Sequence, residues 1–505
     1  MQVSSTASLP APTGGWNTRD PWDQMDPKDA IHLDNWFPET SYCRIRKGHV
    51  AYADTGTGTN VDTLFAYPSG QRLLAASGGE IWDVSDPNAV VSLASGYTSD
   101  KWLSAIFSTG GGEFLIAGNT IGDAPWVYDG ATITPLAVVG VAATALGQPL
   151  PYQQRMFYVE TGTMSVWYTT AGAYQGALTE FDFGPLCKKG GGISAIGTWT
   201  RDNGAGGADD LFVVVTNQGE VLLYTGYDPA SVWALVGIFA CGKPVENFEA
   251  KCLVNTGPDL VLLCADGFQP LSDYLQYGET RAGSTDISRK IGNAAQTAVA
   301  QYGDESGWQG LIYGYQSMLI INIPQGDDTT FVQYVGNTTT GAWCRFKGMN
   351  ARCWATYEQV IYFGGNDGVV YQGLIGVTDN GADIVAEMVT SYQYVGGRGA
   401  NKQFLMARPV MQVNGPLAYS LNVAVDYQNP GVLPTINSNL PVAGTWGSGT
   451  WGVSLWGTSQ LTLQRQWSGV SGIGYAVAVQ MKVSTHTVTA TVNSFDLMYQ
   501  PGWAL

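Results

Sequence analysis

Charged residues are scarce in this sequence of 505 amino acids, since Asp, Glu, Lys and Arg together make up 13% of it. Long solvent-exposed helices need such residues on their outer faces, so a helix-rich fold is disfavoured. Lys and Arg number 24 against 41 Asp and Glu, which gives a net charge of −17. Such an acidic chain is unsuited to gripping phosphate backbones, which argues against a nucleic-acid-binding protein.

Cysteine and histidine are also rare. The seven cysteines form no Cys-x-x-Cys pair, so a disulfide scaffold or a zinc module is disfavoured. The three histidines, His32, His49 and His486, lie far apart and fit no metal motif such as His-Glu-x-x-His. No apolar run is long enough to span a bilayer and no secretory signal opens the chain, so we expect no membrane span and folding in a cytoplasm.

Catalytic signatures are missing as well, since neither Gly-x-Ser-x-Gly nor Gly-x-Gly-x-x-Gly occurs. The segment Gly237–Lys243 fits Gly-x-x-x-x-Gly-Lys, but Pro244 follows where a Ser or Thr should hold Mg²⁺. Acidic clusters at 202–210 and 379–383 lack EF-hand spacing, which favours turn residues over Ca²⁺ ligands. We therefore predict no enzyme, no catalytic residue, no cofactor site and no metal site. A propeller glycosidase remains open on composition, because carboxylates and tryptophans are plentiful.

What the sequence has in abundance is glycine, with 65 residues, and aromatic residues, at 12%. Short β-branched or aromatic segments alternate with Gly, Asp, Asn and Pro from about residue 50 to 375, as in hairpins. Their centres recur with a mean step of 48 residues, at Ile81, Val127, Val166, Val221, Phe268, Leu319 and Val369. This period predicts a β-propeller of six or seven blades, with one helix near Ile287–Ala300.

Composition and the pattern of expected strands divide the chain into three parts. Residues 1–50 predict an extended arm and a short helix that begins near Asp26 and Pro27 and ends at Pro38. Residues 51–378 form the propeller-like domain. Residues 379–505 have longer alternating strands, which predict an antiparallel β-sandwich-like domain. The fold class is thus all-β. In the last part Trp446, Trp451 and Trp456 lie in a Trp/Gly-rich loop and are candidate docking aromatics, with a place in the sandwich core as the alternative.

The N-terminal stretch has a pattern of its own: a glycine-led arm with Asn-Thr-Arg, then Met-x-Pro-x-x-Ala, then Asn-x-x-Pro before Arg-x-Arg-x-Gly. The residues that carry this pattern are Gly15, Asn17, Met25, Pro27, Ala30, Asn35, Pro38, Arg44, Arg46 and Gly48. With them the stretch resembles the opening of tail proteins from short-tailed bacteriophages. Two later stretches, TWTRDNGAGGADDLFVVVTNQGEVLLYTG and GAWCRFKGMNARCWATYEQVIYFGGNDGVVYQG, are similar to the same group. The resemblance spans about residues 15–375.

The family is that of tail nozzle or tail hub proteins, also described as packaged-DNA stabilisation proteins. The resemblance implies a structural virion protein that forms a ring, usually a homohexamer, below the portal adaptor. This ring retains the genome and conducts passing double-stranded DNA during ejection, with tail fibre, spike or needle proteins as further partners. The alternative is a receptor-binding, glycan-binding or glycan-degrading tail propeller.

Two expectations about surfaces follow. The composition of the arm predicts that Trp16, Arg19 and Trp22 dock on a neighbouring subunit or the adaptor rather than on their own core, and Arg44 and Arg46 are further candidates for such contacts. Residues 1–50 and 381–505 are nearly neutral, so the charge of −17 falls within 51–380. We expect the propeller to supply much of a negative channel wall, which repels DNA; solubility is the alternative reason for the acidity.

Overall fold

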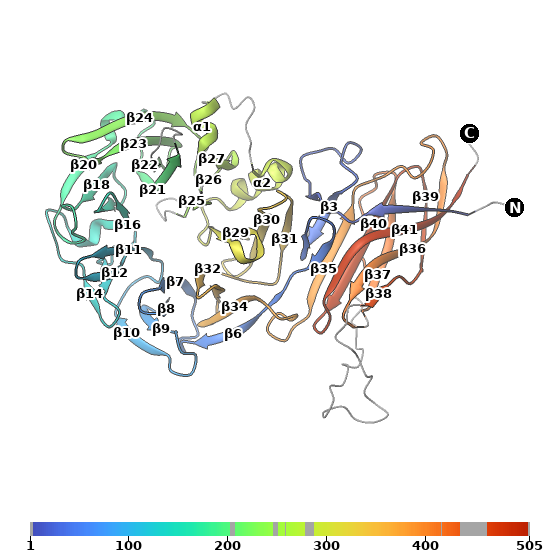
Figure 1. The fold of residues 1–505 in the computed structure, drawn as a ribbon, viewed down its shortest axis with the longest axis horizontal. Helices are drawn as coiled ribbons and strands as arrows, with labels where there is room; N and C mark the ends of the chain where they lie inside the picture. Colours follow the sequence, from blue (N-terminus) through green and yellow to red (C-terminus); the bar gives the residue numbers. More distant parts are fainter. Residues whose placement is uncertain are drawn as a thin grey trace.

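The computed structural model describes residues 4–202, 208–245, 251–257, 259–277, 287–415, 417–434 and 462–502. The fold is all-β, with a propeller beside a β-sandwich, and both ends of the chain lie at the far end of the sandwich (Figure 1). The described residues include two α-helices, α1 (Leu271–Tyr277) and α2 (Gly292–Tyr302). The 3₁₀ turns are η1 (Ala143–Ala145), η2 (Gly184–Leu186), η4 (Arg289–Ile291) and η5 (Gly314–Gln316).

Seven blades make up the propeller within the described residues. In chain order they are β7–β10 (Val61–Tyr67, Arg72–Ser77, Glu80–Asp83, Val91–Ser95), β11–β14 (Leu103–Thr109, Gly112–Gly118, Trp126–Tyr128, Ile133–Pro135), β16–β18 with β20 (Leu146–Tyr152, Arg155–Glu160, Ser165–Tyr168, Thr179–Asp182), β21–β24 (Ile193–Asp202, Ala208–Thr216, Glu220–Asp228, Val232–Ala240), β25–β27 (Leu253–Asn255, Leu260–Cys264, Gly267–Pro270), β28–β31 (Gln309–Tyr313, Met318–Pro324, Phe331–Asn337, Trp343–Phe346) and β32–β34 with β6 (Cys353–Tyr357, Val360–Gly364, Val369–Ile375, Gly48–Asp54). A small parallel pair, β15 (Val138–Val139) and β19 (Gly176–Ala177), lies between two blades in sequence.

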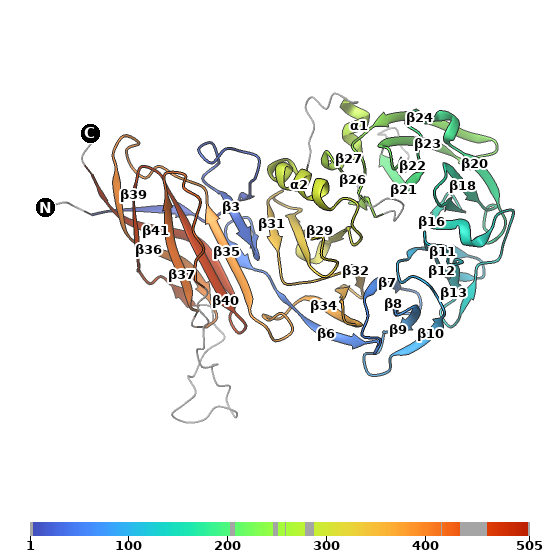
Figure 2. The ribbon, with the colours of Figure 1, turned by 180° about the vertical axis from the view of Figure 1, so that it is seen from behind.

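The ring closes on a strand from the N-terminal part of the chain. Strand β6 is the outer strand of the seventh blade and pairs antiparallel with β34, as both views show (Figures 1 and 2). The second strands of the blades, such as β26 and β29, are buried along their whole length. Since neighbouring blades cover both faces of each sheet, these strands are continuous apolar runs rather than alternating ones.

Two sheets form the sandwich. One contains β1 (Ser5–Pro10), β4 (Trp36–Pro38), β5 (Cys43–Ile45), β36 (Lys402–Val413), β38 (Thr462–Gln464), β39 (Ser468–Gly474) and β41 (Ala490–Pro501). The other contains β2 (Gly15–Trp16), β3 (Asp29–Asp34), β35 (Ile384–Thr390), β37 (Tyr419–Val425) and β40 (Val477–Thr485), and it continues into the sixth blade because β3 pairs with β31. The N-terminal strands therefore belong to the C-terminal domain.

The helix predicted from Asp26 to Pro38 is wrong, because residues 29–34 form strand β3. Asp26 does start a turn, since its Oδ1 accepts a hydrogen bond from the main-chain N–H of Lys28 (2.8 Å). The chain then pairs antiparallel with β35, a partner more than 350 residues away. Tertiary pairing thus overrides the local capping signal. The helix predicted near Ile287–Ala300 is confirmed as α2.

Polar side chains connect the inner strands of neighbouring blades. The Gln309 amide donates to Trp354 O (2.8 Å) and accepts from Trp354 N–H (2.8 Å). Gln148 bonds Ile196 in the same two-sided way, at 2.8 Å each. Inner strands of adjacent blades do not pair as a sheet, so these amides satisfy main-chain groups that would otherwise lack partners.

We expect Gln309→Met to lower the free energy of unfolding by about 1–3 kcal/mol, because it leaves the Trp354 N–H and C=O without partners. Urea denaturation measures the change. The matched control is Gln24→Met at an exposed position, which should be close to neutral. Equal stability of both variants would contradict the role given to Gln309.

Candidate functional site: the joint between propeller and sandwich

The chain crosses between the two domains at residues 46–47 and again at residues 376–383. An ion pair connects the two crossings: the Arg46 guanidinium donates to Asp379 Oδ1 (2.7 Å) and Oδ2 (2.5 Å). Its remaining donors go to Asn35 Oδ1 (2.8 Å), Lys47 O (2.9 Å) and Lys347 O (2.5 Å). The Arg46 side chain is 0% exposed, so its charge is buried with all five N–H groups bonded.

A second ion pair lies where β3 meets the sixth blade. Arg345 of β31 binds the Asp34 carboxylate at 2.8 and 3.0 Å, and the Lys347 ammonium lies 2.6 Å from Oδ2. The His32 ring nitrogen Nε2 is 2.9 Å from the same oxygen. Asp34 and Arg345 are also the residues at which β3 and β31 pair. We call the six residues Asp34, Asn35, Arg46, Arg345, Lys347 and Asp379 the joint.

Asn35 connects these two ion pairs. Its main-chain N–H donates to Arg345 O (2.8 Å), and its Oδ1 accepts from Lys347 N–H (2.8 Å) as well as from Arg46. Its amide nitrogen donates to Val385 O (2.7 Å) in the sandwich. The backbone of Asn35 is left-handed, with φ of 58°, which asparagine tolerates better than most residues.

Gly48 allows the two crossings to approach each other. A Cβ at this position would lie 1.7 Å from Thr378 O, so no other residue fits without moving the backbone. The main-chain N–H of His49 also donates to Thr378 O (2.9 Å). Because Gly48 has no side chain, the main chain of the first crossing can lie in close contact with the main chain at Thr378.

The arm forms a further tie, which we call the strap (residues 14–19). Trp16 packs edge-on against Tyr334, with ring centroids 5.1 Å apart, and Arg345 lies over its ring at 5.4 Å. Thr18 Oγ1 accepts a hydrogen bond from Ala294 N–H (3.2 Å) in the first turn of α2. Lys290 Nζ donates to Gly14 O (2.9 Å). The strap thus holds the sandwich against the propeller.

The prediction that the arm docks on a neighbour rather than its own core is wrong for Trp16 and Arg46. Trp16 is 7% exposed and packed within its own chain, and Arg46 is buried in the joint. Strand β1 pairs with β41, a partner almost 500 residues away that local composition could not indicate.

The other candidates stay predictions. Arg19 is paired with Asp20 (2.7 Å), Trp22 is stacked on Tyr392, and Arg44 lies over the Phe37 ring at 4.7 Å. Trp446, Trp451 and Trp456 lie outside the described residues.

Electrostatics hold both joint aspartates in the ionised form. Burial by itself would raise the pKa of Asp379, but the adjacent His49 and Arg46 side chains outweigh it and keep the pKa below its usual value. For Asp34, burial is likewise outweighed by His32 and Arg345, so its pKa is far below the usual range. Both aspartates thus remain charged at neutral pH.

We expect the joint to weaken in acid. A carboxyl whose native pKa is lowered contributes its full stability above the unfolded-state pKa of about 4 and loses it as pH falls through the native value. The urea midpoint should therefore drop as pH falls below about 4. In Asp34→Asn this drop should be smaller. An identical pH profile for both proteins would contradict the assignment.

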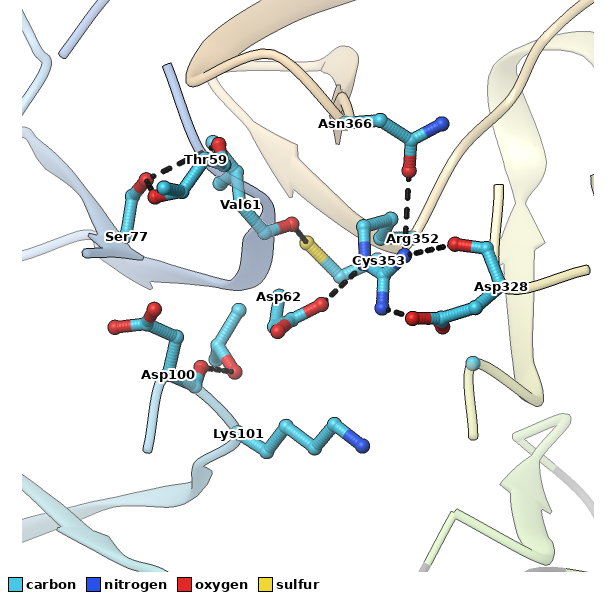
Figure 3. Close-up of polar contacts among 12 residues, drawn as sticks. Thr59, Val61, Asp62, Ser77, Asp100, Lys101, Asp328, Arg352, Cys353 and Asn366 are labelled. Carbon is cyan, nitrogen blue, oxygen red and sulfur yellow. Dashed lines mark hydrogen bonds and ion pairs between the residues drawn. The ribbon is translucent and has the colours of Figure 1, made fainter. Parts of the chain in front are cut away.

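A second buried arginine lies at the seam where the propeller closes (Figure 3). Arg352 binds Asp62 of the first blade and, at 2.9 Å, Asp328 of the sixth, while the neighbouring Cys353 Sγ donates to Val61 O (3.3 Å). The Arg352 side chain is 4% exposed. One guanidinium thus joins three blades.

The described residues can also be searched for side-chain groups that would bind a metal or form a catalytic triad. The described residues contain no group of three or more His, Cys, Asp or Glu placed to hold a metal. Asp383 accepts from Ser484 Oγ (2.6 Å) and lies 2.7 Å from His486 Nδ1, so the carboxylate separates the hydroxyl from the ring, unlike a Ser-His-Asp triad. The segment Gly237–Lys243 lies on β24 and the loop after it. Among the described residues no helix is long and apolar enough to cross a membrane.

Comparisons with known proteins give no family. No family model and no curated protein matches the chain. Among solved structures, the computationally designed Ika8 protein is 14% identical, with 68% of this chain and 96% of that chain covered and a TM-score of 0.36. Sqt1 of Saccharomyces cerevisiae is 12% identical, with 65% and 99% covered and a TM-score of 0.35. Raptor of Chaetomium thermophilum is 9% identical, with 66% and 29% covered and a TM-score of 0.41. These likenesses say nothing about function.

Proposed function

We propose that this protein is a structural component of a short-tailed bacteriophage tail, a nozzle or hub protein. Six copies form a ring below the portal adaptor, retain the packaged genome and conduct it during ejection. Fibre, spike or needle proteins attach to the same tail. In the virion tail the protein has a structural role, which is to maintain the ring and its channel, and it catalyses no reaction.

The observation that carries the proposal is the position of the residues that resemble the tail family. Eight of the ten are buried, and all of these except Met25 lie in the strap or in the stretch from β3 to β6, which includes the first crossing between the domains. Asn35, Arg46 and Gly48 are central to the joint. The resemblance thus falls on residues that fix the orientation of one domain to the other.

A joint of this kind suits a channel wall. Buried ion pairs with fully bonded donors have one favoured geometry, and breaking one leaves a charge without a partner. Two domains so connected move as one body when DNA slides past or a neighbour pulls. The acidic propeller fits such a wall because it offers few cations to trap phosphates.

The test is a phage that lacks the gene for this protein. Capsids should fill with DNA and then lose it, so that nuclease-resistant genomes fall to background while capsid yield stays normal. Supplying the intact gene in trans should restore filled particles. Stable, filled particles without the protein would refute the proposal.

A further inference from the structure

A cluster of aromatic side chains lies on the sandwich and includes none of the joint residues. We call Trp22, Tyr392, Tyr394 and Tyr427 the aromatic patch. Trp22 is stacked on Tyr392 with centroids 5.9 Å apart and planes at 27°. Tyr392 lies 4.9 Å from Tyr427, whose hydroxyl bonds that of Tyr394 at 2.9 Å. Trp22, Tyr394 and Tyr427 are partly exposed, so the patch meets solvent with rings and hydroxyls together.

The patch is held by an unusual turn. Asp426 and Tyr427 follow β37 with φ of 49° and 60°, a left-handed conformation that glycine and asparagine adopt more easily than tyrosine. Asp426 Oδ1 accepts from the main-chain N–H of Tyr475 (2.7 Å), which secures the turn. Strained non-glycine positions of this kind gather at functional sites. The strain here places a tyrosine ring on the patch.

Charges of both signs border the rings. The Arg398 guanidinium is 4.7 Å from the Tyr394 ring centroid. Burial, Tyr394 and then the nearby Asp23 carboxylate raise the pKa of Tyr427 to about 12. Its hydroxyl is therefore protonated at neutral pH and able to donate or accept. The site combines apolar ring surfaces with a carboxylate, a guanidinium and phenol hydroxyls.

We propose that the aromatic patch binds a neutral saccharide. Pyranose rings present C–H faces that pack on aromatic rings and a rim of hydroxyls that need both donors and acceptors. Trp22 and Tyr427 supply the ring surfaces, while Asp23 and Arg398 bond the hydroxyls. The two opposite charges cancel, so the site favours a neutral sugar over a phosphorylated or sulfated one. This inference does not depend on the proposed assembly of six copies around a channel.

The experiment applies the intact protein to an array of neutral and acidic bacterial oligosaccharides, followed by calorimetric titration with the best neutral glycan. We expect saturable binding with a dissociation constant of about 1 mM or tighter. Trp22→Ala and Tyr427→Asn should each weaken it by about tenfold or more. Asparagine suits the left-handed backbone, so Tyr427→Asn should keep the wild-type melting temperature and separate lost binding from lost folding.

The control variant is Tyr315→Ala, which removes an aromatic side chain with 63% exposure on the propeller. It should bind like the wild type. The proposal is overturned if no glycan binds above background, if acidic glycans are preferred, or if Trp22→Ala and Tyr427→Asn bind as well as the control.

Discussion

Replacement of Arg46 by Met is expected to lower the free energy of unfolding by about 3–5 kcal/mol. The substitution keeps the aliphatic volume but leaves the Asp379 carboxylate buried without its main partner, and removal of one member of a buried pair costs this much. It also removes the donors to Asn35 Oδ1 and Lys347 O. Urea denaturation at pH 7 measures the loss.

A double variant tests the physical reason. Arg46→Met with Asp379→Leu removes both charges and should recover much of the stability, since an apolar pair can replace a buried ion pair at little cost. Arg72→Met is the matched surface control. Arg72 is 45% exposed and pairs with Asp83 at 3.2 Å, so its loss should cost less than about 1 kcal/mol. A double variant no more stable than Arg46→Met would refute this account.

The second large effect is expected at the seam of the propeller. Arg352→Met should lower stability by about 3 kcal/mol or more, because Asp62 loses a buried partner and three blades lose their common contact. Exchange of the main-chain amides in β7 and β32 should speed up first, since Asp62 lies on β7, β32 begins directly after Arg352, and the two strands meet at the seam. Hydrogen-exchange mass spectrometry reads this directly.

Lys243→Met serves as the control, because Lys243 pairs with Asp304 at 2.8 Å on the surface with 51% exposure. Its exchange pattern should match that of the wild type. Uniform acceleration across all blades in Arg352→Met would show that the arginine has no special role in closing the ring.

The propeller could be predicted from the sequence because its signal is periodic and local. Six of the seven predicted repeat centres lie on the third strand of a blade, from Ile81 on β9 to Val369 on β34, and Leu319 lies on the second strand of the sixth. Hairpin turns and apolar runs of this kind need only neighbouring residues to form. The sequence left six or seven blades open, and the described residues form seven.

The joint could not be predicted, because its partners are hundreds of residues apart. Arg46 and Asp379 are separated by 333 positions, and Arg345 and Asp34 by 311. Composition makes an arginine near the N-terminus look like a surface contact, whereas its burial depends on a carboxylate far along the chain. The tail-family resemblance gave a signal, since it includes Asn35, Arg46 and Gly48, but it did not show that these residues meet Asp379.

The acidic charge has a partly structural use. Asp100 accepts hydrogen bonds from Gly78 N–H (2.8 Å) and Gly79 N–H (2.9 Å) of the preceding blade. Glu220 accepts from the main chain of Lys188 and Lys189 at 3.1 and 3.0 Å. Some carboxylates of residues 51–380 therefore join loops within the propeller. That the other carboxylates of residues 51–380 form a negative channel wall stays a prediction.

Cryo-electron microscopy of the assembled protein tests the central claim most directly. The account predicts a closed ring of six copies with an axial channel, each copy keeping its joint intact and turning carboxylates of residues 51–380 toward the lumen. A protein that stays monomeric, or an assembly without a channel, would contradict it.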